Sequence, residues 1–387
     1  MTHHVKVLIV HLHKHDQTQG EGMKALILAG GFGTRLRPLS CTRPKLMFPI
    51  ANRPLLDWTL ERLAASGVKE VVLAVNYMAH VLENHYGRTQ YEMKISYSHE
   101  TKPLGTAGPI KKAEQLIGRD SPFFVLNGDI LSEIDYQGLL KAHQENGATA
   151  TITLLAVSDP SRFGVVEIDS SNRIHRFVEK PKPGETPSNL INAGVYALDP
   201  SIFTYIKPNE KVSMEREVFP VLAKEGKLFG YKCNKLWIDI GKPADYLQAN
   251  RYMLDKISSK QPILGEAVEI QPNAKITKTV AIGERVEIGE DAHIGPYAAI
   301  GENTVIGKGT RIENSIIFPG AWIDAHTSIR GAIIGEGAIV GQWVKIENGV
   351  IVGDHAIIYD NVTLTQEVTV CPSKEVDESV LEPRQVM

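Results

Sequence analysis

Residues 24–45 place a short apolar run, a glycine-rich segment and several cations close together, a combination that suits the binding of a polyphosphate. The apolar run Ala-Leu-Ile-Leu-Ala covers residues 25–29, residues 30–38 are Gly-Gly-Phe-Gly-Thr-Arg-Leu-Arg-Pro, and residues 43–45 are Arg-Pro-Lys. Glycine lets backbone amides approach an anion closely, and arginine adds paired donors for phosphate oxygens. The spacing matches neither a P-loop nor a dinucleotide fingerprint, so neither a P-loop hydrolase nor a dinucleotide-dependent oxidoreductase is favoured.

Two carboxylates follow apolar runs that lie far apart in the sequence. Asp129 stands in Asn-Gly-Asp, directly after Phe-Phe-Val-Leu at 123–126, and Asp239 follows Leu-Trp-Ile at 236–238. Magnesium prefers one or two protein carboxylates together with phosphate oxygens and water. Asn-Gly-Asp alone is also an ordinary turn sequence. Beside a glycine-rich phosphate loop, however, the two aspartates favour a Mg²⁺ site made of Asp129 and Asp239.

The elements that must position these residues alternate between strand and helix as far as about residue 258. Strand-like runs cover 25–28, 71–75, 123–126 and 151–155, and helix-like stretches cover 54–66 and 138–146. The alternation predicts an α/β domain with a Rossmann-like, mostly parallel sheet covered on both faces. Such sheets bind ligands at the carboxyl ends of their strands, so we expect the glycine-rich segment and both aspartates at that edge.

The carboxy-terminal third carries a six-residue apolar repeat. It runs through Ile270, Ile276, Ile282, Ile288, Ile294, Ile300, Ile306 and Ile312 and resumes in phase at Ile334, Val340, Ile346, Val352 and Ile358. Such a repeat predicts a left-handed parallel β-helix, in which each hexad forms one side of a triangular coil and the aliphatic side chains stack inside. Five-residue steps from Ile312 to Ile317 and from Ile329 to Ile334 predict a local distortion or a protruding loop.

The pattern divides the chain into three parts. Residues 1–22 hold five of the 13 histidines without any periodic pattern, so we expect a disordered or non-native extension. The α/β domain is expected over 23–258 and the β-helix over 259–387. A coil of stacked strands has exposed backbone at its ends and flat faces along its length, so the β-helix is expected to form a homo-oligomer.

Composition narrows the classes of partner and the compartment. The 387 residues include 42 basic and 45 acidic side chains, a net charge of -3, which argues against nucleic acid or a membrane surface as the main partner. The three cysteines are scattered and no apolar run approaches the length of a membrane span. These features predict a cytoplasmic protein without structural zinc.

The glycine-rich segment resembles the Gly-Gly-x-Gly-Thr-Arg-Leu-x-Pro…Pro-Lys element of the sugar-nucleotide pyrophosphorylases, which join a nucleoside triphosphate to a sugar 1-phosphate. Phe-Val-Glu-Lys-Pro at 177–181 and Asn-Ala-Gly at 192–194 match two further motifs of this family in order and spacing. Across residues 23–387 the motif order, including the terminal Glu-Pro-Arg at 382–384, is most similar to the mannose-1-phosphate guanylyltransferases. Glucose-specific thymidylyl- and uridylyltransferases share most of the motifs and stand as the alternative.

The resemblance implies a set of site residues. The catalytic residues it implies are Arg35, Lys45, Asp129 and Asp239, the last two also binding Mg²⁺. The implied nucleotide site comprises Leu28, Ala29, Gly30, Gly31, Gly33, Thr34, Arg35, Glu100, Gly105, Thr106, Asn127 and Gly128. The implied sugar-phosphate site comprises Gly164, Glu179, Lys180, Asn192 and Gly194. Glu179 and Lys180 could equally be a solvated charge pair, and Glu100 a solvated loop charge.

The chemistry that follows needs no nucleophilic side chain. A sugar phosphate oxygen is already anionic near neutral pH, so it needs in-line delivery and relief from repulsion by the triphosphate. GTP is favoured as the donor because guanine presents two adjacent N–H donors that the Glu100 carboxylate can accept together. Two other classes stay open: a non-catalytic regulatory subunit, and a bifunctional enzyme whose β-helix transfers acetyl groups.

Overall fold

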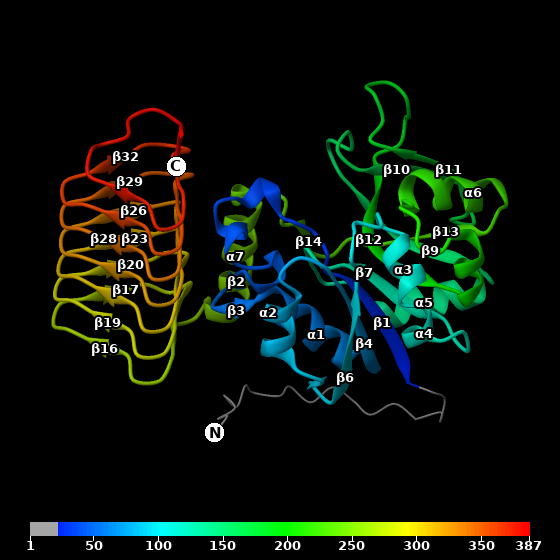
Figure 1. Cartoon of the computed structure of the whole chain (residues 1–387), viewed down its shortest axis with the longest axis horizontal. Helices are drawn as coiled ribbons and strands as arrows, with labels where there is room; N and C mark the ends of the chain where they lie inside the picture. Colours follow the sequence, from blue (N-terminus) through cyan, green and yellow to red (C-terminus); the bar gives the residue numbers. More distant parts are fainter. Residues whose placement is uncertain (1–21) are drawn as a thin grey trace.

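The computed structural model describes residues 22–387, which form an α/β region and a β-helix lying beside it (Figure 1). The α/β region runs from β1 (Met23–Leu28) to α7 (Pro243–Ser258), and the β-helix from β15 (Ile263–Leu264) to β35 (Gln385–Val386). The extension expected over residues 1–22 lies, apart from Gly22, outside the described residues. No helix within the described part of the chain is long and apolar enough to cross a membrane.

The α/β region is built on one twisted sheet of ten strands. Its strands are β1, β4 (Val68–Val75), β5 (Thr89–Gln90), β6 (Met93–His99), β7 (Phe123–Asn127), β9 (Ala150–Ala156), β10 (Gly164–Ile168), β11 (Ile174–Glu179), β12 (Leu190–Leu198) and β13 (Leu228–Lys232). The central strands β7, β1, β4 and β6 are parallel neighbours in that order, and β12 joins β7 in the antiparallel direction. This arrangement confirms the predicted Rossmann-like sheet, and the four predicted strands all form.

Helices cover both faces of this sheet because successive strand residues are buried on alternate sides. In β1, Leu26 belongs to one apolar cluster while Ala25 and Ile27 belong to the other. The helices are α1 (Leu55–Ala65), α2 (Ala79–Tyr86), α3 (Gly108–Lys112), α4 (Glu114–Ile117), α5 (Tyr136–Glu145), α6 (Phe219–Lys224) and α7. The predicted helices at 54–66 and 138–146 correspond to α1 and α5. Short 3₁₀-helices cover Thr34–Leu36, Leu39–Cys41, Lys45–Met47 and Pro200–Tyr205, and a short π-helix covers Met214–Val218.

Two small sheets stand apart from the main one. β8 (Ile130–Ser132) pairs antiparallel with β14 (Trp237–Asp239), and β2 (Pro49–Ile50) pairs with β3 (Arg53–Pro54). Asp239 ends a strand, as its place after Leu-Trp-Ile predicts, but that strand does not belong to the main sheet. That strand is β14, in which Trp237, Ile238 and Asp239 pair with Ser132, Leu131 and Ile130 of β8.

The carboxy-terminal region is a coil of short parallel strands in three sheets, as the hexapeptide repeat predicts for a left-handed β-helix. One sheet contains β15, β18 (Val280–Ile282), β21 (Ala298–Ile300), β24 (Ile316–Ile317), β27 (Ile333–Ile334), β30 (Ile351–Val352), β33 (Thr369–Val370) and β35. The second contains β16 (Glu269–Ile270), β19 (Glu287–Ile288), β22 (Val305–Ile306), β25 (Trp322–Ile323), β28 (Ile339–Val340), β31 (Ile357–Ile358) and β34 (Glu375–Val376). The third contains β17 (Lys275–Ile276), β20 (His293–Ile294), β23 (Arg311–Glu313), β26 (Ser328–Arg330), β29 (Lys345–Ile346) and β32 (Thr363–Leu364).

Two details of the repeat prediction need correction. Ile270 is 44% exposed rather than stacked inside, because the first coil has no further coil beneath it. The five-residue steps produce the expected local distortion, a shortened coil, and no protruding loop. Val305 pairs with Trp322 and Trp322 with Ile339, so these coils shorten to 17 residues and the aliphatic stack continues.

The sheet that begins with β15 faces the α/β region and is apolar on both sides. In β24, β27 and β30, the second residue of each strand points into the coil. The first residues of these strands, Ile316, Ile333 and Ile351, belong instead to an apolar cluster with α7 and residues 36–58. Phe318 joins that cluster with no exposed surface. The two regions therefore share a continuous apolar interface. In Figure 1, α7 and β2 lie on the side of the α/β region that faces the β-helix.

Candidate active site

A cavity of about 460 Å³ opens at the carboxyl ends of β1, β4 and β7. Twelve of the residues expected in the nucleotide and catalytic sets line it: Leu28, Gly30, Gly31, Gly33, Thr34, Arg35, Lys45, Glu100, Gly105, Thr106, Asn127 and Asp129. Ala29 and Gly128 are buried beside it instead. A Cβ on Gly128 would lie 2.8 Å from the carbonyl oxygen of Leu28, so this glycine lets β7 approach β1 closely.

The glycine-rich segment leaves β1 as an open loop and ends in a 3₁₀ turn at Thr34–Leu36. Gly33 begins that turn with φ 58° and ψ 31°, a left-handed conformation that glycine adopts without strain. Its carbonyl oxygen accepts hydrogen bonds from the Leu36 amide at 2.9 Å and from Ser40 Oγ at 2.8 Å. The loop is therefore held in shape while its exposed residues, Gly31 and Arg35 among them, face the cavity.

Lys45 is the cation nearest the carboxylates. It is 7% exposed, and its Nζ lies 2.7 Å from Asp129 Oδ2. The Asp129 carboxylate compensates the charge of this buried ammonium group. The pair fixes the Lys45 ammonium group beside the glycine-rich loop, where both residues line the cavity.

Asp239 is brought beside Asp129 by the β8–β14 pair. The amide of Ile240 donates to the Asp129 carbonyl oxygen at 3.0 Å, so the two aspartates occupy neighbouring backbone positions. Burial, and then the charge of Asp129, raises the pKa of the Asp239 carboxyl, while Lys45 and Arg35 act in the opposite direction. Asp239 does not line the cavity, but Gly241, two residues later, does so and lies against the Arg35 guanidinium.

Glu100 lies at the end of β6 on the far side of the cavity. Its Oε2 accepts a hydrogen bond from the Leu104 amide at 3.1 Å, and its Oε1 approaches Gly30. Burial raises the pKa of this carboxyl. Glu100 is thus half-buried in the cavity wall, and one of its oxygens is already engaged by the loop that carries Gly105 and Thr106.

The residues expected to bind the sugar phosphate gather in a second group outside the cavity lining. Gly164 and Glu179 are directly paired between β10 and β11, and Lys180 Nζ lies 3.9 Å from Glu179 Oε1. In β12, Asn192 Oδ1 accepts the Gly194 amide at 2.9 Å. A Cβ on Gly194, which has φ 70°, would lie 2.6 Å from Asn127 Nδ2, so this group adjoins the nucleotide set through Asn127. Burial, and then Glu215, raises the pKa of Glu179.

Several polar residues of the site were not foreseen. Asn76 lines the cavity directly after β4, so the rule that located Asp129 after β7 would also have located it. Lys211 lines the opposite wall and has no comparable sequence signal. Glu215 accepts hydrogen bonds from Thr106 Oγ1 at 2.6 Å and from Ser213 Oγ at 2.7 Å. The Thr106 hydroxyl therefore connects the cavity wall to residues 213–215.

Fold and cavity together define a nucleotidyltransferase. Residues 24–256 match the family model described as nucleotidyl transferase. HddC from Yersinia pseudotuberculosis, also solved in complex with GMP-PN, superposes with a TM-score of 0.52 at 31% identity, covering 60% of this chain and 99% of that one.

The β-helix narrows the family further. Residues 276–386 match the model described as GMPPB C-terminal domain. The mannose-1-phosphate guanylyltransferase catalytic subunit beta of Danio rerio is 39% identical over 373 residues, covering 94% of this chain and 100% of the relative. Mannose-1-phosphate guanylyltransferase 1 of Arabidopsis thaliana is 40% identical over 371 residues with the same coverage. The chain belongs to the mannose-1-phosphate guanylyltransferase family.

Proposed function

We propose that this enzyme transfers the guanylyl group of GTP to mannose 1-phosphate, giving GDP-mannose and pyrophosphate. The observation that carries the proposal is the cavity lined by the glycine-rich loop and the Lys45–Asp129 pair, with Asp239 beside Asp129. The names of the full-length relatives supply the two substrates, since both regions of this chain are matched in them.

The chain's own residues act by holding and neutralising charge. The attacking oxygen of the sugar phosphate is already anionic, so no side chain has to remove a proton from it. Arg35 and Lys45 face the cavity and reduce the repulsion between the two anionic substrates, while the amides of residues 30–34 hold the triphosphate. In-line positioning of the two phosphates accounts for the remaining rate enhancement.

Asp129 and Asp239 would hold a magnesium ion with the triphosphate. The donor set fits this metal: burial, and then the charge of Asp129, raises the pKa of Asp239, and a divalent cation between the two carboxylates would remove their mutual repulsion. Within residues 22–387 no group of three or more His, Cys, Asp or Glu side chains is placed to bind a metal, so phosphate oxygens and water would complete the shell. The ion would supply positive charge to the triphosphate.

The second group of residues is the proposed mannose 1-phosphate site. We assign the sugar hydroxyls to Glu179 and the sugar phosphate to Lys180, with Gly164, Asn192 and Gly194 forming the pocket around them. Support comes from their clustering on β10–β12 and from the contact of Gly194 with Asn127, which joins this group to the nucleotide cavity.

Assembly through the β-helix and a cytoplasmic location complete the proposal. Trp322 and Ile339, on neighbouring strands of one outer face, are 50% and 45% exposed, and such a face is suited to cover by another copy. Cys41, Cys233 and Cys371 are free thiols, which suits a reducing compartment. Light scattering tests the assembly, and a monodisperse full-length monomer would contradict it.

One assay tests the activity. Pyrophosphate release is measured for GTP, UTP, dTTP and ATP, each combined with mannose 1-phosphate and glucose 1-phosphate. GTP with mannose 1-phosphate is expected to give the highest kcat/KM. Preference for a pyrimidine triphosphate with glucose 1-phosphate would indicate a thymidylyl- or uridylyltransferase, and no release with any pair would indicate a regulatory subunit.

A further inference from the structure

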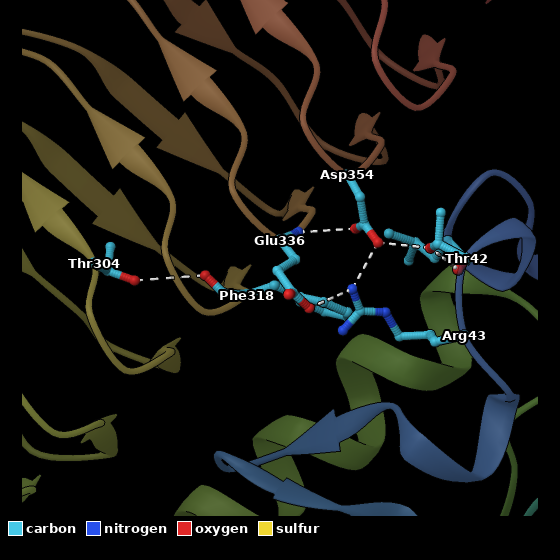
Figure 2. Close-up of polar contacts among 7 residues, drawn as sticks. Thr42, Arg43, Thr304, Phe318, Glu336 and Asp354 are labelled. Atoms are coloured by element: carbon cyan, nitrogen blue, oxygen red, sulfur yellow. Dashed lines mark hydrogen bonds and ion pairs between the residues drawn. The ribbon is translucent and has the colours of Figure 1, made fainter. Parts of the chain in front are cut away.

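Two residues of the phosphate-binding segment make polar contacts with the β-helix rather than with the cavity. Asp354 lies in the turn after β30, and its Oδ2 accepts hydrogen bonds from Thr42 Oγ1 and from Arg43 Nη2, both at 2.6 Å. Arg43 Nη2 also lies 2.8 Å from Glu336 Oε2. Figure 2 shows these four side chains converging from the two regions. The chain positions that meet here are more than 290 residues apart.

Asp354 is held rigidly from the β-helix side. It is 2% exposed, and its Oδ1 accepts the backbone amide of Glu336 at 2.8 Å. The Arg43 guanidinium is also nearly buried and lies 4.7 Å from the centroid of the Phe318 ring. Each charge is desolvated and compensated by the other, so removing one partner leaves the other buried without compensation.

The β-helix itself needs only one of these two carboxylate oxygens. Asp360 stands at the equivalent place in the next hexad, and its Oδ1 accepts the Gln342 amide at 2.8 Å, just as Asp354 accepts that of Glu336. Asp360, however, is exposed. At Asp360, the bond of Oδ1 to the neighbouring coil is therefore sufficient for this turn. By comparison, Oδ2 of Asp354 makes its hydrogen bonds to the α/β region.

Those contacts lie close to the active site along the chain. Thr42 ends the 3₁₀ turn Leu39–Cys41, and only Arg43 and Pro44 separate it from Lys45, whose Nζ pairs with Asp129. Proline has a fixed φ and limits the motion of that link. On the other side, Ser40 Oγ bonds to Gly33 of the phosphate loop. A shift at Thr42 or Arg43 is therefore transmitted to Lys45.

We propose that Asp354 is a positioning residue for the transfer reaction: by holding Thr42 and Arg43 it sets the place of Lys45 against Asp129. The inference rests on the proposed function, because Lys45 neutralises phosphate charge in that reaction. It gives the β-helix a role in turnover that does not depend on assembly.

The test compares matched substitutions in the full-length chain. Asp354→Asn keeps the shape and the acceptor for the Glu336 amide but turns an amide toward the two donors of the α/β region. We expect kcat to fall about tenfold or more while KM for both substrates changes little, since mispositioning acts on the transition state. Asp360→Asn, which changes the same kind of β-helix turn, is expected to leave kcat within about twofold.

A double-mutant cycle separates positioning from general instability. If Asp354 acts through Lys45, Asp354→Asn should have little further effect on kcat in a Lys45→Gln background. Thr42→Val, which removes one donor and leaves the ion pair, carries the test if Asp354→Asn does not fold, and a kcat loss of about threefold is expected.

Some outcomes would overturn the proposal. Undiminished kcat in Asp354→Asn, or in Thr42→Val when that variant stands in for it, would do so, as would an equal loss in the Lys45→Gln background. These results require an active wild-type enzyme. Inactivity of the wild-type chain with every substrate pair would instead overturn the proposed function, and this role with it.

Discussion

The two regions of this chain are built from contacts of opposite range. In the β-helix, most strands pair with a strand 17 or 18 residues away, so each coil depends on its immediate neighbours. In the α/β region, the cavity is lined by residues between Leu28 and Gly241 that come from several different strand ends and loops. The β-helix repeats one local strand arrangement, whereas the α/β region brings distant residues together in one cavity.

This difference shows where chemistry can arise. A repeat presents similar side chains at similar positions, so it yields flat faces and a uniform aliphatic stack. The carboxyl edge of an open sheet brings unlike residues together, because each strand contributes its own loop there. The interface joins the two kinds of structure through an apolar cluster and the Asp354 contacts.

The largest expected effect breaks the interface between the regions. Phe318 is fully buried there, with its ring centroid 6.3 Å from that of Phe48. Phe318→Ala is expected to lower the free energy of unfolding by about 3 to 5 kcal/mol and to separate the unfolding of the two regions. Calorimetry should then show two transitions instead of one.

A matched control for this prediction lies inside the coil. Ile334→Ala removes a buried aliphatic side chain from the β-helix core, not from the interface. It should destabilise the β-helix without uncoupling the α/β region. One unchanged cooperative transition in Phe318→Ala would show that the two regions do not stabilise each other.

The next effect concerns the acidic pair of the α/β region. Asp129→Asn or Asp239→Asn is expected to lower kcat about a hundredfold or more, because each weakens the proposed magnesium site. The measurement is pyrophosphate release at saturating Mg²⁺, with circular dichroism as a check of the fold. The same substitution at Asp360 of the β-helix is the control, and near-normal turnover in either active-site variant would rule out that aspartate as a ligand.

Base discrimination is expected to change less. Glu100→Gln replaces a carboxylate that can accept two guanine N–H groups, so GTP should lose about 1 to 3 kcal/mol of transition-state binding relative to UTP. The ratio of kcat/KM for the two nucleotides is the measurement. The assignment of Glu100 to the base fails if this ratio stays the same.

The smallest effect separates the regions by acid sensitivity. Burial lowers the pKa of His143 in α5 to about 4, whereas His326 and His355 of the β-helix are exposed. As the pH falls, His143 is protonated in the unfolded state before it is protonated in the folded state. The free energy of unfolding of the α/β region is therefore unaffected above about pH 6.5 and falls by about 1 kcal/mol at about pH 5.5.

Hydrogen exchange at both pH values measures this effect region by region. The α/β region should open more readily at the lower pH, and His143→Gln should reduce the difference. His355→Gln is the matched control in the β-helix. Equal acid sensitivity of wild type and His143→Gln would mean that another group governs it.

The regularities of the sequence predicted most of what is local. The glycine-rich loop, Lys45 and Asp129 follow recognisable strand ends or motif spacings, and the aliphatic repeat predicts the coil of the β-helix. The apolar pairs at 316–317, 333–334 and 351–352 also mark the covered face, because the other two sheets place Glu, His, Arg or Lys at many of the corresponding outer positions. The expectation that functional residues directly follow strands would also have located Asn76, which follows β4.

By itself, then, the sequence determined the class of fold, the family and the glycine-rich loop that lines the cavity, because hydrophobic periodicity and motif spacing act over short stretches of chain. Only the tertiary structure decided that Asp239 reaches Asp129 through an antiparallel pair with β8, that Lys211 closes the cavity, and that Asp354 meets Thr42 and Arg43. These contacts have no local signal. They depend on how two surfaces with independent sequence patterns pack together, and neither pattern by itself specifies the contacts between them.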